Sequence, residues 1–287
     1  MATTAGIIRA PKRPAGWTAP GPAPRPPHDR PDVWPGEGED LCYLSGDFRI
    51  LQRTDGHRWS MDDLVTAWLA KTRAHATPPG LAVDLGCGIG SVLLFVAWSF
   101  PDARCVGLEA QTLSVGMARR SIAWNGVGER VEAREGDLRE PQHLADLVGR
   151  AELVTGTPPY FVPGAGTASP LPQREPCRFE LRGGIEDYLA AAARLLAPGA
   201  RFVACEGGPG DQRARVEAGA KAAGLVVTAW RDVIPKEGKP PLLAIFEARA
   251  AGEACETMAP LVVRDAAGKW TEDYMAVREA MGIPPPP

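Results

Sequence analysis

The stretch "LAVDLGCGIGSVLLFVAWSF", residues 81–100, decides the fold. A short apolar run ends in a turn that holds Gly86, Gly88 and Gly90, and a second apolar run of helical length follows from Ser91. Glycine permits a tight turn and lets a ligand approach the backbone, while the first amides of the helix lack partners inside it. The pattern therefore predicts a strand, a ligand-binding turn and a helix.

Strands and helices are expected to alternate from there to about residue 250. The six further strands are "CVGLE", "RVEAREGD", "AELVTG", "ARFVACE", "LVVTAWRDV" and "PLLAIFEA", with helices over 112–124, 185–196 and 210–223. Only "IPKEGKP" separates the last two strands, so these should pair antiparallel at one edge. The fold class is α/β: a seven-stranded, doubly wound, Rossmann-like sheet.

The flanking segments differ from this core in composition. Residues 1–38 are too rich in Pro and Gly to pack, and we expect a disordered basic arm. Residues 39–80 predict a small N-terminal cap, a hairpin followed by a helix that starts near Ser60. The core covers 81–250, and 251–287 should form a hairpin and helix tail packed on it.

Bulk composition excludes several classes of protein. With 287 residues and 45% hydrophobic content the chain can bury a full core. A net charge of −3 excludes binding to nucleic acid through overall charge, so any RNA site must be local. The longest apolar runs are about half of a membrane span, and six cysteines at least 18 residues apart predict neither a zinc site nor a disulfide framework. We expect no membrane or metal partner, and the sequence does not indicate an oligomeric state.

The N-terminal arm leaves the expected location open. The first 35 residues carry five basic side chains against two acidic ones and lack an apolar signal core. A cytoplasmic protein with a basic tail is expected, and organellar targeting through the arm is the alternative.

Two carboxylates extend the glycine turn into a candidate cofactor site. Glu109 ends the next strand, 19 residues after Gly90, where a carboxylate can accept both hydroxyls of a ribose. A dehydrogenase would share this feature, but its fingerprint wants glycine or alanine where this chain has Ser91. Asp84 would also place negative charge beside a pyrophosphate, so a sulfonium cofactor with an amino-acid tail fits better. For each feature alone, an ordinary turn with a solvated acid is the alternative.

The segment "TGTPPYF", residues 155–161, lies at the end of the fourth expected strand. Pro158 and Pro159 fix φ and remove two backbone donors, which leaves a rigid shelf of acceptors. The carboxyl edge of an open α/β sheet is where such folds place their chemistry. An adenine or amide nitrogen is a poor nucleophile because its lone pair is delocalised. Acceptors that engage its N–H bonds and position it would serve a methyl transfer.

"DLGCGIG" and "TPPY" together resemble motif I and the NPPY motif of class I AdoMet-dependent methyltransferases that act on amino groups. The resemblance implies S-adenosyl-L-methionine as cofactor, with Asp84 and Gly86 at its methionine end and Asp137 of "EGDL" beside its adenine. It also implies that the Thr157 and Pro158 oxygens accept from the target amine while Tyr160 stacks on the planar target.

Thr157 departs from the NPPY pattern, which has Asn at this position. The hydroxyl can still accept a hydrogen bond, but it is shorter than an amide and lacks the paired donor. Three hypotheses follow: activity with altered geometry, a different acceptor such as a glutamine amide or a small molecule, or a binding module that has lost catalysis.

A closer resemblance covers roughly residues 40–282. "FRILQRTDGHRWSMDDLVTAWLA", "PQREPCRFE" and "RDVIPKEGKPPLLAIFEARAAG" are similar to segments of the bacterial tRNA (adenine-N6)-methyltransferases that modify valine tRNA. This resemblance implies an enzyme that methylates adenine N6 in RNA, with tRNA as the RNA. The alternatives are an N-methyltransferase of a protein glutamine or small amine, and a non-catalytic AdoMet-binding partner subunit.

The same resemblance implies a lid that closes over an unstacked base. Its residues, taken as substrate-binding, are Phe161, Arg174, Arg178 and Glu180. An ordinary surface loop with one ion pair is the alternative, and His57 is expected to cap or pack rather than to catalyse.

Overall fold

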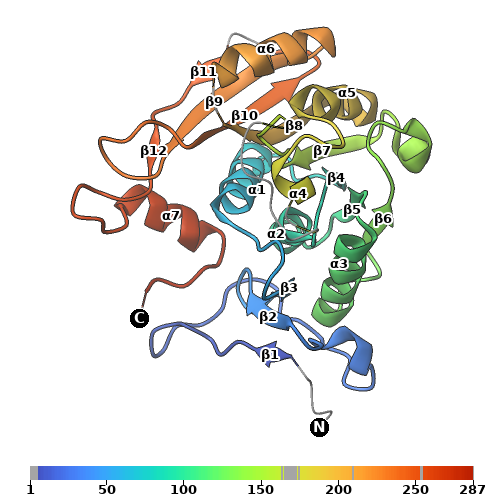
Figure 1. Ribbon diagram of the computed structural model, residues 1–287, viewed down its shortest axis with the longest axis vertical. Helices are drawn as coiled ribbons and strands as arrows, with labels where there is room; N and C mark the ends of the chain where they lie inside the picture. The colour runs from blue at the N-terminus through green and yellow to red at the C-terminus, as the bar shows by residue number, and fades with distance from the viewer. Residues whose placement is uncertain are drawn as a thin grey trace.

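The computed structural model describes residues 6–162, 164, 173, 175–208, 210–252 and 255–286. Its large sheet has the strand order β6–β5–β4–β7–β8–β10–β9, as Figure 1 shows. Neighbours from β6 to β8 are parallel, and β10 is antiparallel to both β8 and β9. The seven strands are β4 (Leu81–Leu85), β5 (Arg104–Glu109), β6 (Val131–Glu135), β7 (Ala151–Gly156), β8 (Leu196–Gly207), β9 (Val226–Ile234) and β10 (Leu243–Arg249).

The predicted seven-stranded, doubly wound sheet with its antiparallel final hairpin is confirmed. Within residues 251–287, where we expected a hairpin, the two short strands β11 (Glu256–Thr257) and β12 (Leu261–Val262) each pair in parallel with β9 and not with each other, and they bring the sheet to nine strands. Two-residue strands lack the alternating apolar run that marks a strand in sequence, so the pattern could not show them.

Helices cover both faces of the sheet because its inner strands are apolar on both sides. Along β4, Ala82 packs into one core and Val83 into the other, as the two-residue period of a strand requires. One core takes in α1 (Met61–Ala74), α2 (Ser91–Ser99), α3 (Thr112–Asn125) and α7 (Glu272–Ala280). The other takes in η2 (Pro141–Leu147), α5 (Ile185–Leu195) and α6 (Gln212–Ala222). The short helix α4 (Glu175–Arg178) lies near the carboxyl edge.

Residues 39–80 form a hairpin and a helix. Strands β2 (Glu39–Tyr43) and β3 (Arg49–Arg53) pair antiparallel, and α1 follows. The backbone amide of Ser60 donates to the Asp63 carboxylate at 2.9 Å, which satisfies an amide at the start of the helix. Because α1 packs against β7 and β8, this end of the helix lies above the carboxyl edge of the sheet.

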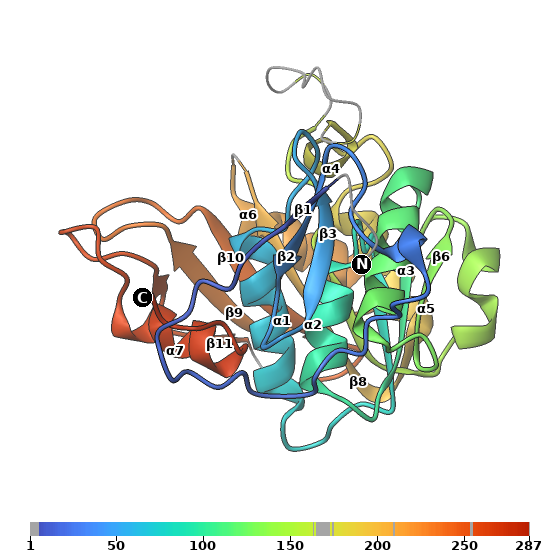
Figure 2. The same ribbon diagram turned by 90° about the horizontal axis from the view of Figure 1, so that it is seen from below.

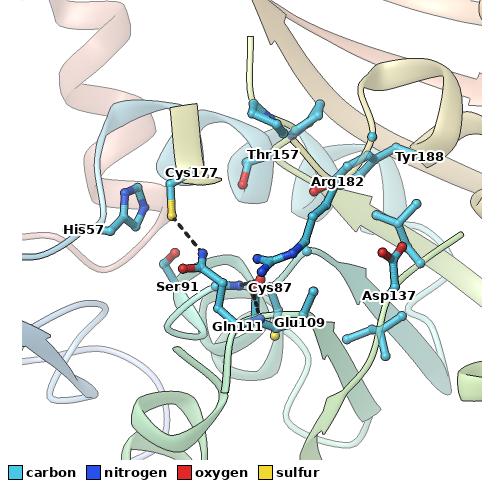
Figure 3. A pocket seen from close by; sticks show the side chains of 18 of the residues that line it. His57, Cys87, Ser91, Glu109, Gln111, Asp137, Thr157, Cys177, Arg182 and Tyr188 are labelled. Carbon is cyan, nitrogen blue, oxygen red and sulfur yellow. Dashed lines mark hydrogen bonds between the residues drawn. The ribbon is translucent and has the colours of Figure 1, made fainter. Parts of the chain in front are cut away.

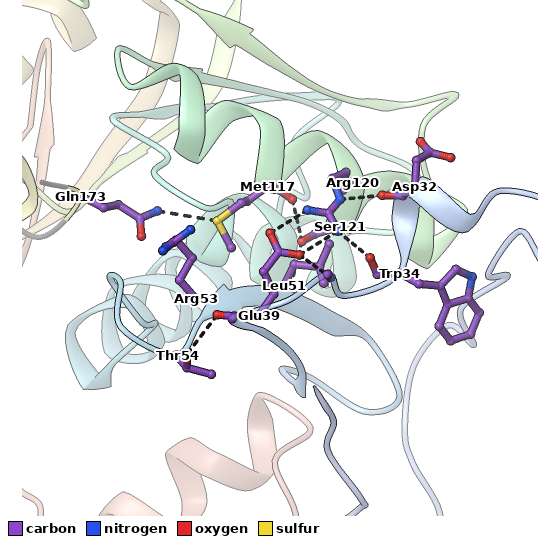
Figure 4. Close-up of polar contacts among 12 residues, drawn as sticks. Asp32, Trp34, Glu39, Leu51, Arg53, Thr54, Met117, Arg120, Ser121 and Gln173 are labelled. Carbon is purple, nitrogen blue, oxygen red and sulfur yellow. Dashed lines mark hydrogen bonds and ion pairs between the residues drawn. The ribbon is translucent and has the colours of Figure 1, made fainter. Parts of the chain in front are cut away.

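Residues 6–38 lie along the core, where we expected a disordered arm. Strand β1 (Ile7–Ile8) pairs in parallel with β2, and Figure 2 shows the segment running across the helical face. Arg9 binds the fully buried carboxylate of Asp40 at 2.7 Å. Arg120 of α3 donates to the backbone carbonyls of Asp32 and Trp34 (Figure 4). Asp32 belongs to the 3-10 helix η1 (Pro31–Val33), and Trp34 follows it directly. A segment that cannot form its own core is thus ordered by partners on the core. Residues 1–5 lie outside the described residues.

The C-terminal segment packs against the cap and the sheet edge. Helix α7 contacts α1 and β12, and the backbone amide of Gly46 donates to the carbonyl of Gly282 at 2.8 Å. All six cysteines are free thiols. Within the described part of the chain, no helix is both long and apolar enough to cross a bilayer.

Candidate active site

One pocket lies at the carboxyl edge of the sheet, where β4, β5, β6 and β7 end side by side. Its floor is formed by residues 86–88, 108–111, 136–138 and 157–160, each directly at the end of one of these strands. The start of α1 and residues from the segment 177–188 close over it. Gly86 and Thr157 are 71 residues apart in the sequence but line the same pocket, because β4 and β7 are neighbours in the sheet. Figure 3 shows Thr157 among the residues around this pocket.

The glycine turn adopts backbone angles that favour glycine. Gly86 has φ of 60°, Gly88 of 53° and Gly90 of 91°, all in the left-handed region. At Gly86 a side chain would also collide with the hydroxyl of Tyr188. Gly86 and Gly88 line the pocket. Gly90 lies just outside it as the residue that precedes α2, so its role is in the turn.

Glu109 joins the glycine turn to the loop after β5. One of its carboxylate oxygens accepts from the amide of Gly88 at 3.0 Å, and the other accepts from the amide of Gln111 at 2.7 Å. Burial raises the pKa of Glu109, while these two hydrogen bonds and the charge of Arg182 oppose that rise. The carboxylate therefore holds two loops in place and still faces the pocket.

Asp84 and Asp137 occupy different environments. Asp84 is 2% exposed and lies behind the pocket wall, where the Thr155 hydroxyl donates to it at 2.7 Å. Burial is the main cause that raises its pKa to about 7. Asp84 therefore links β4 to β7 and does not itself line the pocket. Asp137 does line the pocket, and Arg139 binds both its oxygens and lowers its pKa.

The shelf residues Thr157, Pro158, Pro159 and Tyr160 all line the pocket. The Tyr160 hydroxyl lies 2.9 Å from the Cys205 sulfur and donates to the Asp62 carboxylate at 3.3 Å. These contacts hold the hydroxyl end of the side chain in place. Rigid prolines and a ring held at its hydroxyl end give the end of β7 a preformed surface for a planar group.

Asp63 is a pocket residue that the sequence pattern did not reveal. It is 4% exposed, lies next to Asp62 at the start of α1, and its Oδ1 atom lies 3.5 Å from the Thr157 hydroxyl. Burial and the neighbouring Asp62 charge raise its pKa to about 8. Acidic residues are common in the first turn of a helix because they stabilise its positive end. The sequence alone therefore gave no reason to assign Asp63 to the pocket.

The expected lid residues lie beside the pocket and not in its wall. The backbone of Phe161 bonds to Arg178 and Glu180, and the Arg178 guanidinium lies 5.7 Å from the Phe161 ring centroid. Glu180 forms an ion pair with Arg215 of α6 at 2.7 Å. Arg174 lies outside the described residues.

Several other side chains complete the pocket. Figure 3 shows Arg182 extending into it toward Glu109, and His57 facing Cys177. Gln111 donates to the Cys177 sulfur at 3.6 Å. His57 and Cys177 come from segments 120 residues apart, so no spacing in the sequence could have joined them.

Negative charge dominates the pocket wall. The lining residues that the structure describes include four acidic side chains and a single arginine, namely Asp62, Asp63, Glu109, Asp137 and Arg182. Asp63, with its pKa of about 8, is largely protonated at neutral pH, so the excess negative charge comes from the other three acids. A concave site with excess negative charge attracts a cationic ligand. S-adenosyl-L-methionine carries a sulfonium and an ammonium group, so the donor set fits this cofactor.

Solved structures share this fold. The chain has the class I methyltransferase fold. It superposes on a predicted O-methyltransferase from Agrobacterium tumefaciens with a TM-score of 0.58 and 18% identity, over 78% of this chain and 98% of the other. No family model matches the chain.

Sequence relatives point to methyl transfer onto nitrogen. The chain is 27% identical over 221 residues to a tRNA1(Val) (adenine(37)-N6)-methyltransferase of Porphyromonas gingivalis, a match covering 75% of this chain and 84% of that protein. It is 32% identical over 125 residues to a release factor glutamine methyltransferase of Mycolicibacterium smegmatis, covering 42% and 43% of the two chains. The predicted AdoMet-dependent N-methyltransferase, its cofactor and the family resemblance are confirmed.

Proposed function

We propose that this class I methyltransferase transfers a methyl group from AdoMet to the N6 atom of an adenine in RNA, and that this RNA is a tRNA. The observation that carries the proposal is the position of the Thr157–Tyr160 shelf, in the same pocket as Gly86 and Glu109. The extent of the match to the Porphyromonas enzyme, three quarters of this chain, supports adenine as the target.

The pocket residues divide between cofactor and target. Gly86 and Gly88 would admit the cofactor close to the backbone, Glu109 would accept from its ribose, and Asp137 would flank its adenine. When bound, AdoMet supplies a methyl group on a positively charged sulfur. The oxygens of Thr157 and Pro158 would accept from the target amine, and the Tyr160 ring would hold the base plane. Positioning of this kind needs no strong base.

A nitrogen in a protein glutamine or a small amine is the second candidate target. The specific observation in its favour is the charge of the wall, where one arginine stands against four acidic side chains. An RNA site is expected to carry a basic footprint, whereas an uncharged amide or a cationic amine tolerates this wall. The relative from Mycolicibacterium, a glutamine methyltransferase by name, supports the same candidate.

The deciding experiment is transfer of labelled methyl from AdoMet to RNA, to protein and to the small-molecule extract of cells that lack this chain. RNA would be digested to nucleosides and protein to amino acids. We expect label in N6-methyladenosine of the small-RNA fraction, and slower labelling with the Tyr160→Ala variant. Label in methylated glutamine or in small amines would favour the second candidate. Cofactor binding without transfer to any fraction would overturn both and indicate a non-catalytic subunit.

A further inference from the structure

Thr157 raises a problem of hydrogen-bond polarity. A hydroxyl can donate or accept, and its hydrogen rotates to suit its partners. A target amine offers hydrogens, so the shelf works only if the Thr157 oxygen turns its lone pairs toward the pocket. Some other group must then take the hydroxyl hydrogen.

Asp63 is placed to take that hydrogen. Its Oδ1 atom lies 3.5 Å from the Thr157 hydroxyl, while Oδ2 accepts from the Ser60 amide at 2.9 Å. Oδ2 serves the helix start and Oδ1 faces Thr157, while the Ser91 side chain also bonds to this carboxyl group. The side chain is 4% exposed, so water offers little competition for this oxygen. Catalytic hydrogen bonds are often long without substrate and tighten in the complex.

We propose that Asp63 is a positioning residue that accepts the Thr157 hydroxyl hydrogen and thereby turns the threonine oxygen into an acceptor for the target amine. The inference rests on the proposed methyl transfer to nitrogen and identifies what stands in for the asparagine amide. A hydroxyl that donates to a carboxylate is also the better acceptor, because hydrogen bonds in a chain polarise one another.

Ionisation of Asp63 sets the direction of this bond. An ionised carboxylate can only accept, whereas a protonated one can donate to Thr157 and turn its hydroxyl hydrogen toward the target. The titratable groups that influence or adjoin this site are Asp62 of α1, Asp84 of β4, and Cys205 of β8 with Tyr160 beside it. Burial and Asp62 raise the pKa of Asp63 to about 8. The methyl-transfer rate should therefore rise with pH as Asp63 ionises.

The test is a double-mutant cycle that combines Asp63→Ala with Thr157→Asn. In the Thr157 background Asp63→Ala should lower kcat by about 10- to 100-fold, the size of a lost hydrogen bond to a charged group, with the KM for AdoMet little changed. In the Thr157→Asn background the amide oxygen accepts without help, so Asp63→Ala should cost about 3-fold or less. The rise of kcat with pH should also vanish in Thr157→Asn.

Asp187→Ala is the matched control, because Asp187 accepts the Gly184 amide at the start of α5 as Asp63 accepts the Ser60 amide, but it does not line the pocket. It should leave kcat and its pH dependence unchanged, and thermal unfolding of every variant would show that the fold persists. Equal losses from Asp63→Ala in both backgrounds, with an active wild type, would overturn this inference alone. A wild type that binds AdoMet but methylates nothing would overturn the proposed function and the inference with it.

Discussion

The two walls of the pocket are built from the sequence in different ways. The cofactor wall, formed by Gly86, Gly88, Glu109 and Asp137, consists of short motifs that each follow a single strand. The acceptor wall, formed by Asp62, Asp63 and residues 157–160, joins the start of α1 to the end of β7, and its Asp63–Thr157 contact spans 94 residues.

Under the proposed function, the first wall binds the cofactor and the second selects the target. The cofactor wall is shaped by backbone amides and by the Glu109 carboxylate, which is bonded to two loops. Because these loops begin where strands end, the geometry of this wall depends on the sheet. Side chains from distant elements shape the acceptor wall. Substitutions such as threonine for asparagine can therefore change the target or its geometry while the cofactor wall and the fold persist.

The largest effect is expected in the cofactor wall, at Glu109. Glu109→Ala removes the acceptor for the amides of Gly88 and Gln111. Hydrogen bonds to a charged group contribute about 1.5–3 kcal/mol each, so AdoMet affinity should fall by about 100-fold or more. Isothermal titration calorimetry measures this directly.

Glu135 supplies the matched control for that prediction. It pairs with Glu109 in register on the neighbouring strand but is exposed and does not line the pocket. Glu135→Ala should leave AdoMet affinity within a few-fold of wild type. Similar losses in both variants would mean that Glu109 acts through the stability of the sheet edge and not through its bonds to the Gly88 and Gln111 amides.

The next effect is expected in the acceptor wall, at Tyr160. Stacking of a base on an aromatic ring contributes about 1–3 kcal/mol, so Tyr160→Ala should lower kcat/KM for the target by about 5- to 150-fold. AdoMet affinity should change little, because the ring lies in the other wall. Tyr160→Phe keeps the ring and loses only the contacts to Asp62 and Cys205, so a smaller loss is expected. If Tyr160→Ala weakened AdoMet binding as strongly as Glu109→Ala, the two walls would not be separable.

The smallest effect concerns Asp84, the buried link between β4 and β7. Its pKa rises from 3.8 to about 7 on folding, so the folded state holds one more proton between these values. Its stabilising contribution is complete below pH 3.8 and is lost as pH rises through 7. Asp84→Asn stays neutral and can still accept from Thr155. Relative to wild type, its free energy of unfolding should rise from pH 5 to 7 by at most about 1.4 kcal/mol per pH unit.

Urea denaturation at several pH values tests this dependence. Asp146→Asn is the control, because the exposed Asp146 has its pKa lowered by Arg134 and stays ionised above pH 5 in both states. A flat difference between Asp84→Asn and wild type would show that Asp84 is ionised in the folded protein. It would then act as a charge beneath the cofactor wall rather than as a neutral link.

Much of this protein follows from local sequence alone. Period-two apolar runs, the glycine turn at 86–90 and the shelf at 157–160 each require only neighbouring residues, and they predicted the sheet, its antiparallel edge and the residues at its carboxyl ends. Where strands end is a local property, and parallel strands bring their carboxyl ends to one edge. The residues that line the pocket at these strand ends could therefore be predicted almost residue by residue.

Tertiary structure alone decided the rest. In the folded chain Asp84 is buried behind the pocket wall, and Asp63 lies beside Thr157. Contacts of Arg9 and Arg120 hold residues 6–38 against the core. These outcomes depend on how the helices pack on the sheet. They also depend on which buried charged groups pair with residues that are distant in the sequence. No period or spacing encodes such contacts, because their free energy appears only when both partners leave water together.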